Sequence, residues 1–412
     1  MLFIALDRFR WVYCQLDTLR RCMPSSIRKA LSELPITLDD TYERMLQGIP
    51  KEKFEHASRL FQCMVTAVRP LRVEELAEIF AIEFGANNAP NLVAGWRPEN
   101  PEEAVLSTCS SFITIIDDRD SKIVQFSHFS VKEFLTSDRL QMSNVGNIHQ
   151  YHIPLEPAHA ILARACVAVL LQADEKHDEG HFGSLPLGFY AIENWARHTR
   201  FGDVASRIED SLAYLFDPTM PHFQPRILLR CVLGMHDVYP VQSFFFSDNP
   251  DKITPLFLAA FCGFGRLAKH LIITHAPDVN AEFGNRYSPL HAASFNGQVD
   301  SARILLDNGA HVNAKGYSDW TPLHYASHYG HLKLVQLLLE KGANLNARNY
   351  VQDTPLCSAS KEGRLEIVRV LLDHGADVNV RGDDGLTLYQ AATRDGHDDV
   401  AQLLLEHGSE KE

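Results

Sequence analysis

The chain has 412 residues, enough for two or three domains, and its composition is that of a globular protein, with 45% hydrophobic and 22% charged residues. The formal net charge is −13 and neither half is basic, so no nucleic-acid or anionic-membrane surface is expected. No apolar run reaches the roughly 18 residues of a membrane span. The eight cysteines form no CxxC pair, which favours a cytoplasmic protein, with the nucleus as the alternative.

The first part of the chain has the apolar spacing of amphipathic helices. Within residues 1–50, one helical face carries Phe9, Val12, Tyr13, Leu16 and Leu19. A longer stripe predicts a helix that Pro70 ends. Its members are Phe54, Ala57, Leu60, Phe61, Met64, Val65 and Val68.

The apolar period changes to that of strands after residue 110. Residues 112–116 and 122–126 flank a polar segment, 117–121, and together predict a β-hairpin. Ser130 and Glu133 have the spacing of a capping box and predict one more helix.

Helices followed by a hairpin are the arrangement of a winged helix, which we assign to residues 51–150. The helix before the wing carries Glu99, Glu102 and Glu103, with no Lys or Arg between residues 98 and 111. Such a helix repels phosphate, so DNA binding is not expected.

A helical spacer is predicted over residues 151–221, and residues 222–250 are interpreted as a degenerate capping half-repeat. From residue 251 to 412 one pattern recurs five times, at spacings of 34, 33, 33 and 33 residues. A fixed period of this size is typical of stacked helical arrays. The five openings are Thr254-Pro255-Leu256, Ser288-Pro289-Leu290, Thr321-Pro322-Leu323, Thr354-Pro355-Leu356 and Thr387-Leu388-Tyr389.

Each position of the repeat has a local role. The opening Ser or Thr can cap a first helix, and Pro suits its first position. A glycine near the ninth position predicts the end of that helix with positive φ; these are Gly263, Gly297, Gly330, Gly363 and Gly396. Leucine pairs in a second helix need a neighbouring repeat to bury them. In the turn between repeats, we expect an asparagine side chain to bond its own backbone; these are Asn280, Asn313, Asn346 and Asn379.

This period, with Thr321-Pro-Leu-His324 in it, resembles the ankyrin repeat. The resemblance implies a rigid array that binds another protein through its turn tips and first-helix ends. The matching positions are Tyr287, Phe295, Asn296, Tyr317, Ser318, Trp320, His328, Tyr329, Tyr350, Val351, Lys361, Glu362, Asp383 and Asp384.

We expect Tyr317, Trp320 and Tyr329 to form a contact cluster whose replacement by alanine removes binding and leaves stability nearly unchanged. The alternative is that some of these rings pack between adjacent tips. The resemblance further implies that His291 and His324 bridge repeats by hydrogen bonds and do not contact a partner.

The segments before the repeats resemble the region that follows the nucleotide-binding core in fungal NACHT–ankyrin proteins, which are STAND signalling NTPases. The residues that carry the resemblance are Arg10–Asp17, Leu34–Arg44, Arg69–Leu76, Phe126–Leu135 and Tyr190–Trp195. On this reading residues 1–50 are a helical remnant of the region after such a core, and His128 matches a histidine that touches the bound nucleotide.

The phosphate loop of such an NTPase is not found, because the chain contains no Gly-Lys dipeptide. Met1 falls where the core of that family ends, which suggests a truncated member, an incomplete gene model or a natural stand-alone form. No catalytic serine or cysteine signature appears, and the pairs His149 with His152 and His177 with His181 lack the companion glutamate of a metal site.

The sequence therefore predicts a mainly α, non-enzymatic interaction protein that has no cofactor and binds a protein partner. Two alternatives stay open: the regulatory half of a nucleotide-hydrolysing switch, and a gene fragment without function.

Overall fold

The computed structural model describes residues 37–85, 90–109, 111–118, 121–172, 185–220, 253–382 and 385–409. Among these residues the chain forms two compact units, which divide between Ile208 and Glu209. The chain is mainly helical, as predicted. The predicted helix over residues 9–19 and the predicted half-repeat at 222–250 lie outside the described residues.

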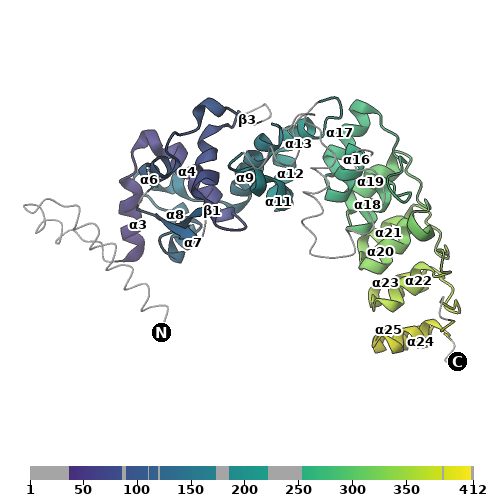
Figure 1. Cartoon of the computed structure of the whole chain (residues 1–412). Helices are drawn as coiled ribbons and strands as arrows, with labels where there is room; N and C mark the ends of the chain where they lie inside the picture. The colour runs from purple at the N-terminus through teal and green to yellow at the C-terminus, as the bar shows by residue number, and fades with distance from the viewer. Residues whose placement is uncertain are drawn as a thin grey trace, which may run out of the picture. The chain divides into compact units, whose positions relative to one another are not determined.

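The first unit consists of helices with a three-stranded and a two-stranded sheet (Figure 1). Its helices are α3 (Leu38–Gln47), α4 (Phe54–Thr66), α5 (Val73–Ala77), α6 (Pro101–Cys109), α7 (Phe129–Leu135), α8 (Asp138–Gln141), α9 (Leu155–Leu170), α11 (Gly188–Thr199) and α12 (Val204–Arg207), with 3₁₀ turns at Lys51–Lys53, Glu78–Ala81, Ala94–Trp96 and Ile148–Tyr151. Its strands are β1 (Leu71–Arg72), β2 (Ile82–Glu83), β3 (Asn91–Leu92), β4 (Ile113–Asp118) and β5 (Ser121–Phe126).

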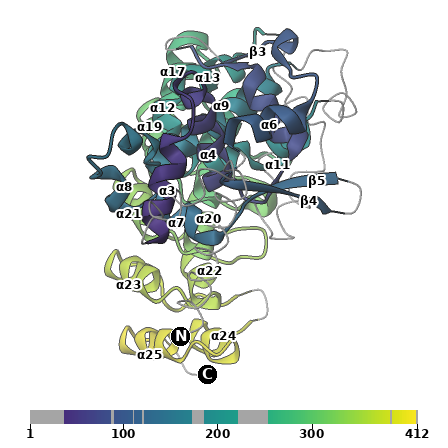
Figure 2. The ribbon, with the colours of Figure 1, turned by 90° about the vertical axis from the view of Figure 1, so that its left-hand side faces the viewer.

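Strands β4 and β5 form the predicted hairpin, which Figure 2 shows side by side. Strand β1 pairs with the other edge of β5, so the sheet order is β1-β5-β4 with antiparallel neighbours. Pairing continues to Asp118 opposite Ser121, further than the sequence indicated. Asp117 lies opposite Lys122, and opposite charges in facing positions stabilise a strand pair that the residue types alone disfavour.

An aromatic core joins the helices of this unit. The ring of Phe61 packs edge-on against Phe112 at 5.3 Å, and Tyr42 packs on Phe134 at 5.4 Å; all four side chains are buried. Helix α4 ends at Thr66, earlier than the predicted stop at Pro70, and Val68 is consequently exposed. A residue before proline is driven into extended backbone, so the helix must end before Arg69.

The second unit contains the repeats. Its helices are α13 (Glu209–Leu215), α16 (Pro255–Cys262), α17 (Gly265–His275), α18 (Pro289–Phe295), α19 (Val299–Asp307), α20 (Pro322–Tyr329), α21 (Leu332–Glu340), α22 (Pro355–Lys361), α23 (Leu365–Asp373), α24 (Leu388–Arg394) and α25 (Asp398–Glu406), with a 3₁₀ turn at Tyr317–Asp319. All five predicted first helices begin directly after the opening Ser or Thr, and all five predicted glycines have positive φ.

Each repeat stacks its two helices on those of the next (Figure 1). The first helices, α16, α18, α20, α22 and α24, form one layer, and the second helices, from α17 to α25, form the other. Helix α13 packs on α17, where the ring of Phe216 lies 6.2 Å from that of Phe264. This stacking buries the leucines that one repeat alone leaves exposed.

Candidate functional site

Two buried histidines fix the turn tips, as predicted. His291 Nδ1 accepts a hydrogen bond from the Ser288 amide at 3.1 Å, so its Nε2 carries the proton and donates to the carbonyl of Ala314 at 3.1 Å. His324 accepts the equivalent bond from the Thr321 amide at 3.2 Å and donates to the Asp353 carbonyl at 3.0 Å, which corresponds to a 3.2 Å bond from His291 Nε2 to the Trp320 carbonyl. Burial lowers the pKa of each histidine to about 4, so both rings are neutral at pH 7.

The turn asparagines join consecutive repeats, and the prediction that they bond their own backbone is wrong. Asn313 Oδ1 accepts from the Asn344 amide at 2.7 Å, and its Nδ2 donates to the Gly342 carbonyl at 3.3 Å. Asn280 makes equivalent bonds to the His311 amide and the Gly309 carbonyl. The local bond is made by the residue two positions earlier; Asp278 Oδ1, for example, accepts from the Asn280 amide at 2.9 Å.

A third set of bonds, which sequence reasoning missed, pins the ends of the first helices. After three of the five helix-ending glycines, the next residue reaches back to the preceding repeat: His331 Nε2 donates to the Phe295 carbonyl at 3.0 Å, and Arg364 Nε donates to the His328 carbonyl at 3.0 Å. His397 does the same to the Lys361 carbonyl at 3.1 Å. The signal was present in the sequence, since polar side chains follow the glycine at a constant spacing.

The three carbonyls that accept these bonds belong to predicted contact positions. The backbone at the contact face is therefore held by side chains of the following repeat, which makes the face rigid before any partner arrives. A rigid surface loses less conformational entropy on binding.

Two predicted contact side chains are inside the array. Tyr287 is buried, and its hydroxyl accepts a 3.0 Å hydrogen bond from Tyr325. Phe295 is also buried, with its ring 4.4 Å from that of Tyr329 and 6.2 Å from that of Phe261. These rings fill the space between adjacent repeats, which is the alternative that the sequence left open, and we exclude them from the proposed surface.

Trp320, His328 and Tyr329 form a half-buried aromatic stack at the base of the tips. The ring of Trp320 lies 5.4 Å from His328, which lies 4.7 Å from Tyr329. Trp320 also packs 4.9 Å from buried Tyr325. Burial lowers the pKa of His328. The carboxylate of Glu362, whose Oε1 lies 3.5 Å from His328 Nδ1, acts in the opposite direction. Since these rings support one another, we expect alanine in place of Trp320 to lower stability, whereas the sequence predicted a nearly unchanged stability.

The turn tips of the third and fourth repeats carry exposed aromatic and apolar side chains. Tyr350 is 78% exposed and Tyr317 is 45% exposed, with Val351 exposed beside Tyr350. The two tips are joined, because the Tyr350 amide donates to the Ser318 carbonyl at 2.8 Å. Ser318 has a φ of 52°, a left-handed conformation that turns the tip at this point.

The other predicted contact residues have local roles or lie elsewhere. Lys361 Nζ forms a 2.8 Å ion pair with Asp353 Oδ2, and Asn296 Nδ2 donates to the Phe261 carbonyl at 2.9 Å. Asp383 and Asp384 lie outside the described residues.

His128 begins helix α7 in the first unit. Its Nδ1 accepts from the Ser130 amide at 3.3 Å, so His128 is the N-cap and the predicted capping role of Ser130 is wrong. The Ser130 hydroxyl instead lies 2.6 Å from His128 Nδ1 and 2.9 Å from the Tyr42 hydroxyl. In this structure His128 therefore caps the first turn of α7.

Within the described ranges, no group of three His, Cys, Asp or Glu side chains is arranged to hold a metal ion. Across the same residues, none of the helices combines the length and the apolar character needed to traverse a bilayer.

Each of the two units matches a known protein family. Residues 23–145 match the family described as "GPI inositol-deacylase, winged helix domain". Residues 231–316, 256–349, 312–382 and 349–412 match the family described as "Ankyrin repeats (3 copies)". The chain therefore carries a winged-helix domain followed by ankyrin repeats, and the predicted fold class is confirmed.

Two characterised proteins are similar to parts of the chain. The "Azaphilone pigments biosynthesis cluster protein L" of Monascus ruber is 29% identical over 296 residues, which are 68% of this chain and 61% of that protein. The "Alpha-latrocrustotoxin-Lt1a" of Latrodectus tredecimguttatus is 39% identical over 56 residues, which are 14% of this chain and 4% of the toxin. The chain thus spans less than two thirds of the length of either relative.

Proposed function

We propose that this chain is a non-enzymatic interaction protein whose ankyrin array binds a protein partner through the tips of its third and fourth repeats. The observation that supports the proposal is the joined pair of tips, which exposes Tyr317, Tyr350 and Val351 on backbone that the neighbouring repeats hold in place. Exposed aromatic side chains on a rigid scaffold are the residues that most often dominate interface energy.

The proposed surface is narrower than the one expected from the sequence. It consists of the exposed tip side chains with the half-buried stack of Trp320, His328 and Tyr329 at their base, and Glu362 beside His328. Asn296, Ser318 and Lys361 contribute backbone and polar groups at its margin, and Asp383 and Asp384 remain part of the proposal. In the cell, we propose that the ankyrin array acts as a sensor arm, in the cytoplasm or the nucleus.

The test is a crosslinking experiment in which a photoreactive amino acid replaces Val351 and crosslinked proteins are identified by mass spectrometry. The amount of a partner crosslinked by the array with this single replacement should fall by about tenfold or more when Tyr317 and Tyr350 are also both changed to Ala. The control is Ile273→Ala, because Ile273 is 70% exposed but lies on the second helix of the first repeat. Equal crosslinking by the double variant contradicts the proposal.

A second candidate function is the regulatory half of a STAND-type nucleotide switch. The match of residues 23–145 to a winged-helix family supports it, together with His128 at the position that touches nucleotide in the resembling proteins. Equilibrium binding of a fluorescent ATP analogue tests this candidate. Saturable, Mg²⁺-dependent binding that His128→Ala weakens supports the switch, and absence of binding supports the non-enzymatic proposal.

A further inference from the structure

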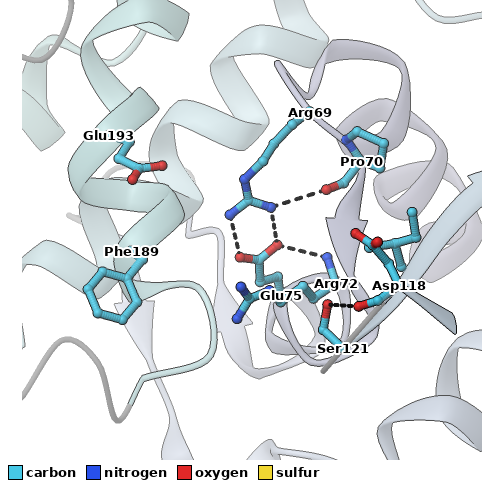
Figure 3. A pocket seen from close by; sticks show the side chains of 9 residues that line it. Arg69, Pro70, Arg72, Glu75, Asp118, Ser121, Phe189 and Glu193 are labelled. Atoms are coloured by element: carbon cyan, nitrogen blue, oxygen red, sulfur yellow. Dashed lines mark hydrogen bonds and ion pairs between the residues drawn. The ribbon is translucent and has the colours of Figure 1, made fainter.

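A pocket of about 370 Å³ lies in the first unit between helix α11 and the edge of the sheet at β1 (Figure 3). Its lining brings together two segments that are far apart in the sequence: Arg69 to Glu75 next to β1, and Phe189 with Glu193 on α11. Arg69 to Glu75 and Glu193 belong to the motifs that resemble the NACHT–ankyrin proteins, and Phe189 directly precedes the second of these motifs. A volume of this size accommodates a small ligand or the side chains of a bound peptide.

The floor of the pocket is a fixed ion pair. Arg69 donates from both terminal nitrogens to the carboxylate of Glu75, at 2.6 and 2.7 Å, and the Arg72 amide donates to the same carboxylate at 2.8 Å. The Arg69 guanidinium also lies over the ring of Tyr190, 5.1 Å from its centroid. Glu75 is buried, and its charge is compensated, so the floor is rigid and contributes almost no net charge.

The rim, in contrast, carries charges that remain available. Arg72 is exposed and has no ion pair among the described residues, and in Figure 3 its side chain extends beyond Glu75 toward the side where Phe189 stands. Glu193 on α11 and Asp118 on β4 are likewise exposed and without an ion pair in the described part of the chain. Phe189, on the same helix as Glu193, exposes 55% of its surface.

These features define the chemistry of a ligand. Three carboxylates and two guanidinium groups line the pocket, and one of each is already paired, so a polyphosphate or nucleotide would meet more repulsion than attraction. A ligand with one anionic group for Arg72, one cationic group for Glu193 or Asp118, and an apolar part for Phe189 complements the rim and leaves one carboxylate to solvent. A peptide segment with an acidic, an apolar and a basic side chain has this combination.

We propose that the pocket between α11 and β1 is a docking site for a peptide segment of mixed charge, in which an acidic side chain pairs with Arg72 and an apolar side chain packs on Phe189. The site lies in the first unit and is separate from the surface proposed on the ankyrin array. The basic group of the peptide lies against Glu193 or Asp118.

A phage-displayed library of random 12-residue peptides, selected on the full 412-residue chain, tests the proposal. We expect enriched peptides that combine an acidic, an apolar and a basic residue. Synthetic, fluorescein-labelled copies should bind Phe189→Ala and Arg72→Glu at least about tenfold more weakly than the unaltered chain, measured by fluorescence polarisation. Replacing the acidic residue of the peptide by Lys should restore binding to Arg72→Glu.

Matched controls separate the pocket from general surface effects. Trp96→Ala removes an aromatic side chain that is also 55% exposed in the same unit but outside the pocket, and Arg200→Glu reverses a charge at an exposed arginine after α11. Both should bind within about twofold of the unaltered chain. Failure to enrich any such peptide overturns the proposal, as does equal binding by Phe189→Ala and Arg72→Glu.

Discussion

The imidazole of His331 lies directly over Gly297 of the preceding repeat. A Cβ atom built on Gly297 would stand 2.5 Å from His331 Nδ1, and the same ring donates to the Phe295 carbonyl two residues before that glycine. Glycine is thus required here for two reasons: its positive φ ends the helix, and its missing side chain leaves room for the histidine.

Gly297→Ala should therefore destabilise the array more than alanine at a glycine that has only the positive φ. Gly309 is the matched control, because its φ is 90° and no atom lies within 4 Å of a built Cβ. The left-handed conformation costs about 1–2 kcal/mol in both variants, and displacement of His331 adds to the cost only at Gly297. Urea unfolding of both variants measures the difference, and equal losses would refute the role of His331.

The asparagines of the inter-repeat turns should differ in importance along the chain. Asn313→Ala removes two bonds to the next repeat and should lower the free energy of unfolding by about 1–2 kcal/mol. Asn379→Ala should be close to neutral, since among the described residues the Asn379 side chain has no hydrogen bond to a following repeat. Thermal unfolding of the pair tests this, and a cost at Asn379 as large as at Asn313 would contradict it.

Stability should fall in mild acid because of the neutral histidines of the array. The pKa of His291 is lowered from 6.5 to about 4 by burial, so between these values the unfolded chain binds a proton that the folded chain does not. The contribution of neutral His291 to the free energy of unfolding is fully present above pH 6.5 and is lost as the pH falls toward 4. At pH 5 the loss from this one histidine is on the order of 2 kcal/mol.

The measurement is urea unfolding at pH 7 and pH 5 for the unaltered chain and for His291→Gln. The variant should be less stable at pH 7 and should lose less stability on acidification, because it lacks the titrating group. An identical pH response in the two proteins would show that His291 does not titrate in this window.

Within the first unit, Tyr190→Phe should weaken the contact between α11 and the end of α4. The Tyr190 hydroxyl accepts from the Val68 amide at 3.2 Å and lies 2.9 Å from His198 Nε2 in a buried site. Removing it leaves the buried His198 Nε2 and the Val68 amide without this partner, which costs about 1–3 kcal/mol. Tyr389→Phe in the array is the control, because no hydrogen bond of its hydroxyl to a described residue is found, and calorimetry distinguishes the two.

Tip aromatics should divide into binding residues and structural residues. Tyr350→Ala should leave the unfolding midpoint within about 1 °C, because surface substitutions of this kind are usually near neutral. Trp320→Ala should lower stability by about 2–4 kcal/mol, since it leaves a gap beside Tyr325 and His328. Thermal unfolding measures both, and a neutral Trp320→Ala would mean that its ring is free to contact a partner.

Local rules predicted the repeats well, because each repeat contains its own start, stop and apolar stripe. Thr254 caps α16, Gly263 ends it, and His291 bridges to the next turn, all as the residue types indicate. The errors concern partners about one repeat away. Asn313 was predicted to bond its own backbone and the bond of His331 was not predicted, because their acceptors lie 29 and 36 residues distant.

Burial of aromatic residues was the second source of error. Tyr287 and Tyr350 were both predicted as contact residues, yet one is buried and the other is exposed. Tyr287 directly precedes the opening Ser288, where the hydroxyl of Tyr325 from the next repeat reaches it, whereas Tyr350 lies four residues before the opening Thr354. In the first unit, the apolar pattern predicted the wing, but the capping by His128 depends on side-chain geometry that the Ser130–Glu133 spacing concealed.

The backward-reaching side chains give the array a direction. His331, Arg364 and His397 each hold the carbonyl of an earlier repeat, so support for a given segment comes from the C-terminal side. Loss of the fifth repeat would release the Lys361 carbonyl first, whereas Phe295 would keep its bond. Damage at one end of the solenoid would therefore spread one repeat at a time, and the tips nearest the C-terminus would loosen before those at the centre.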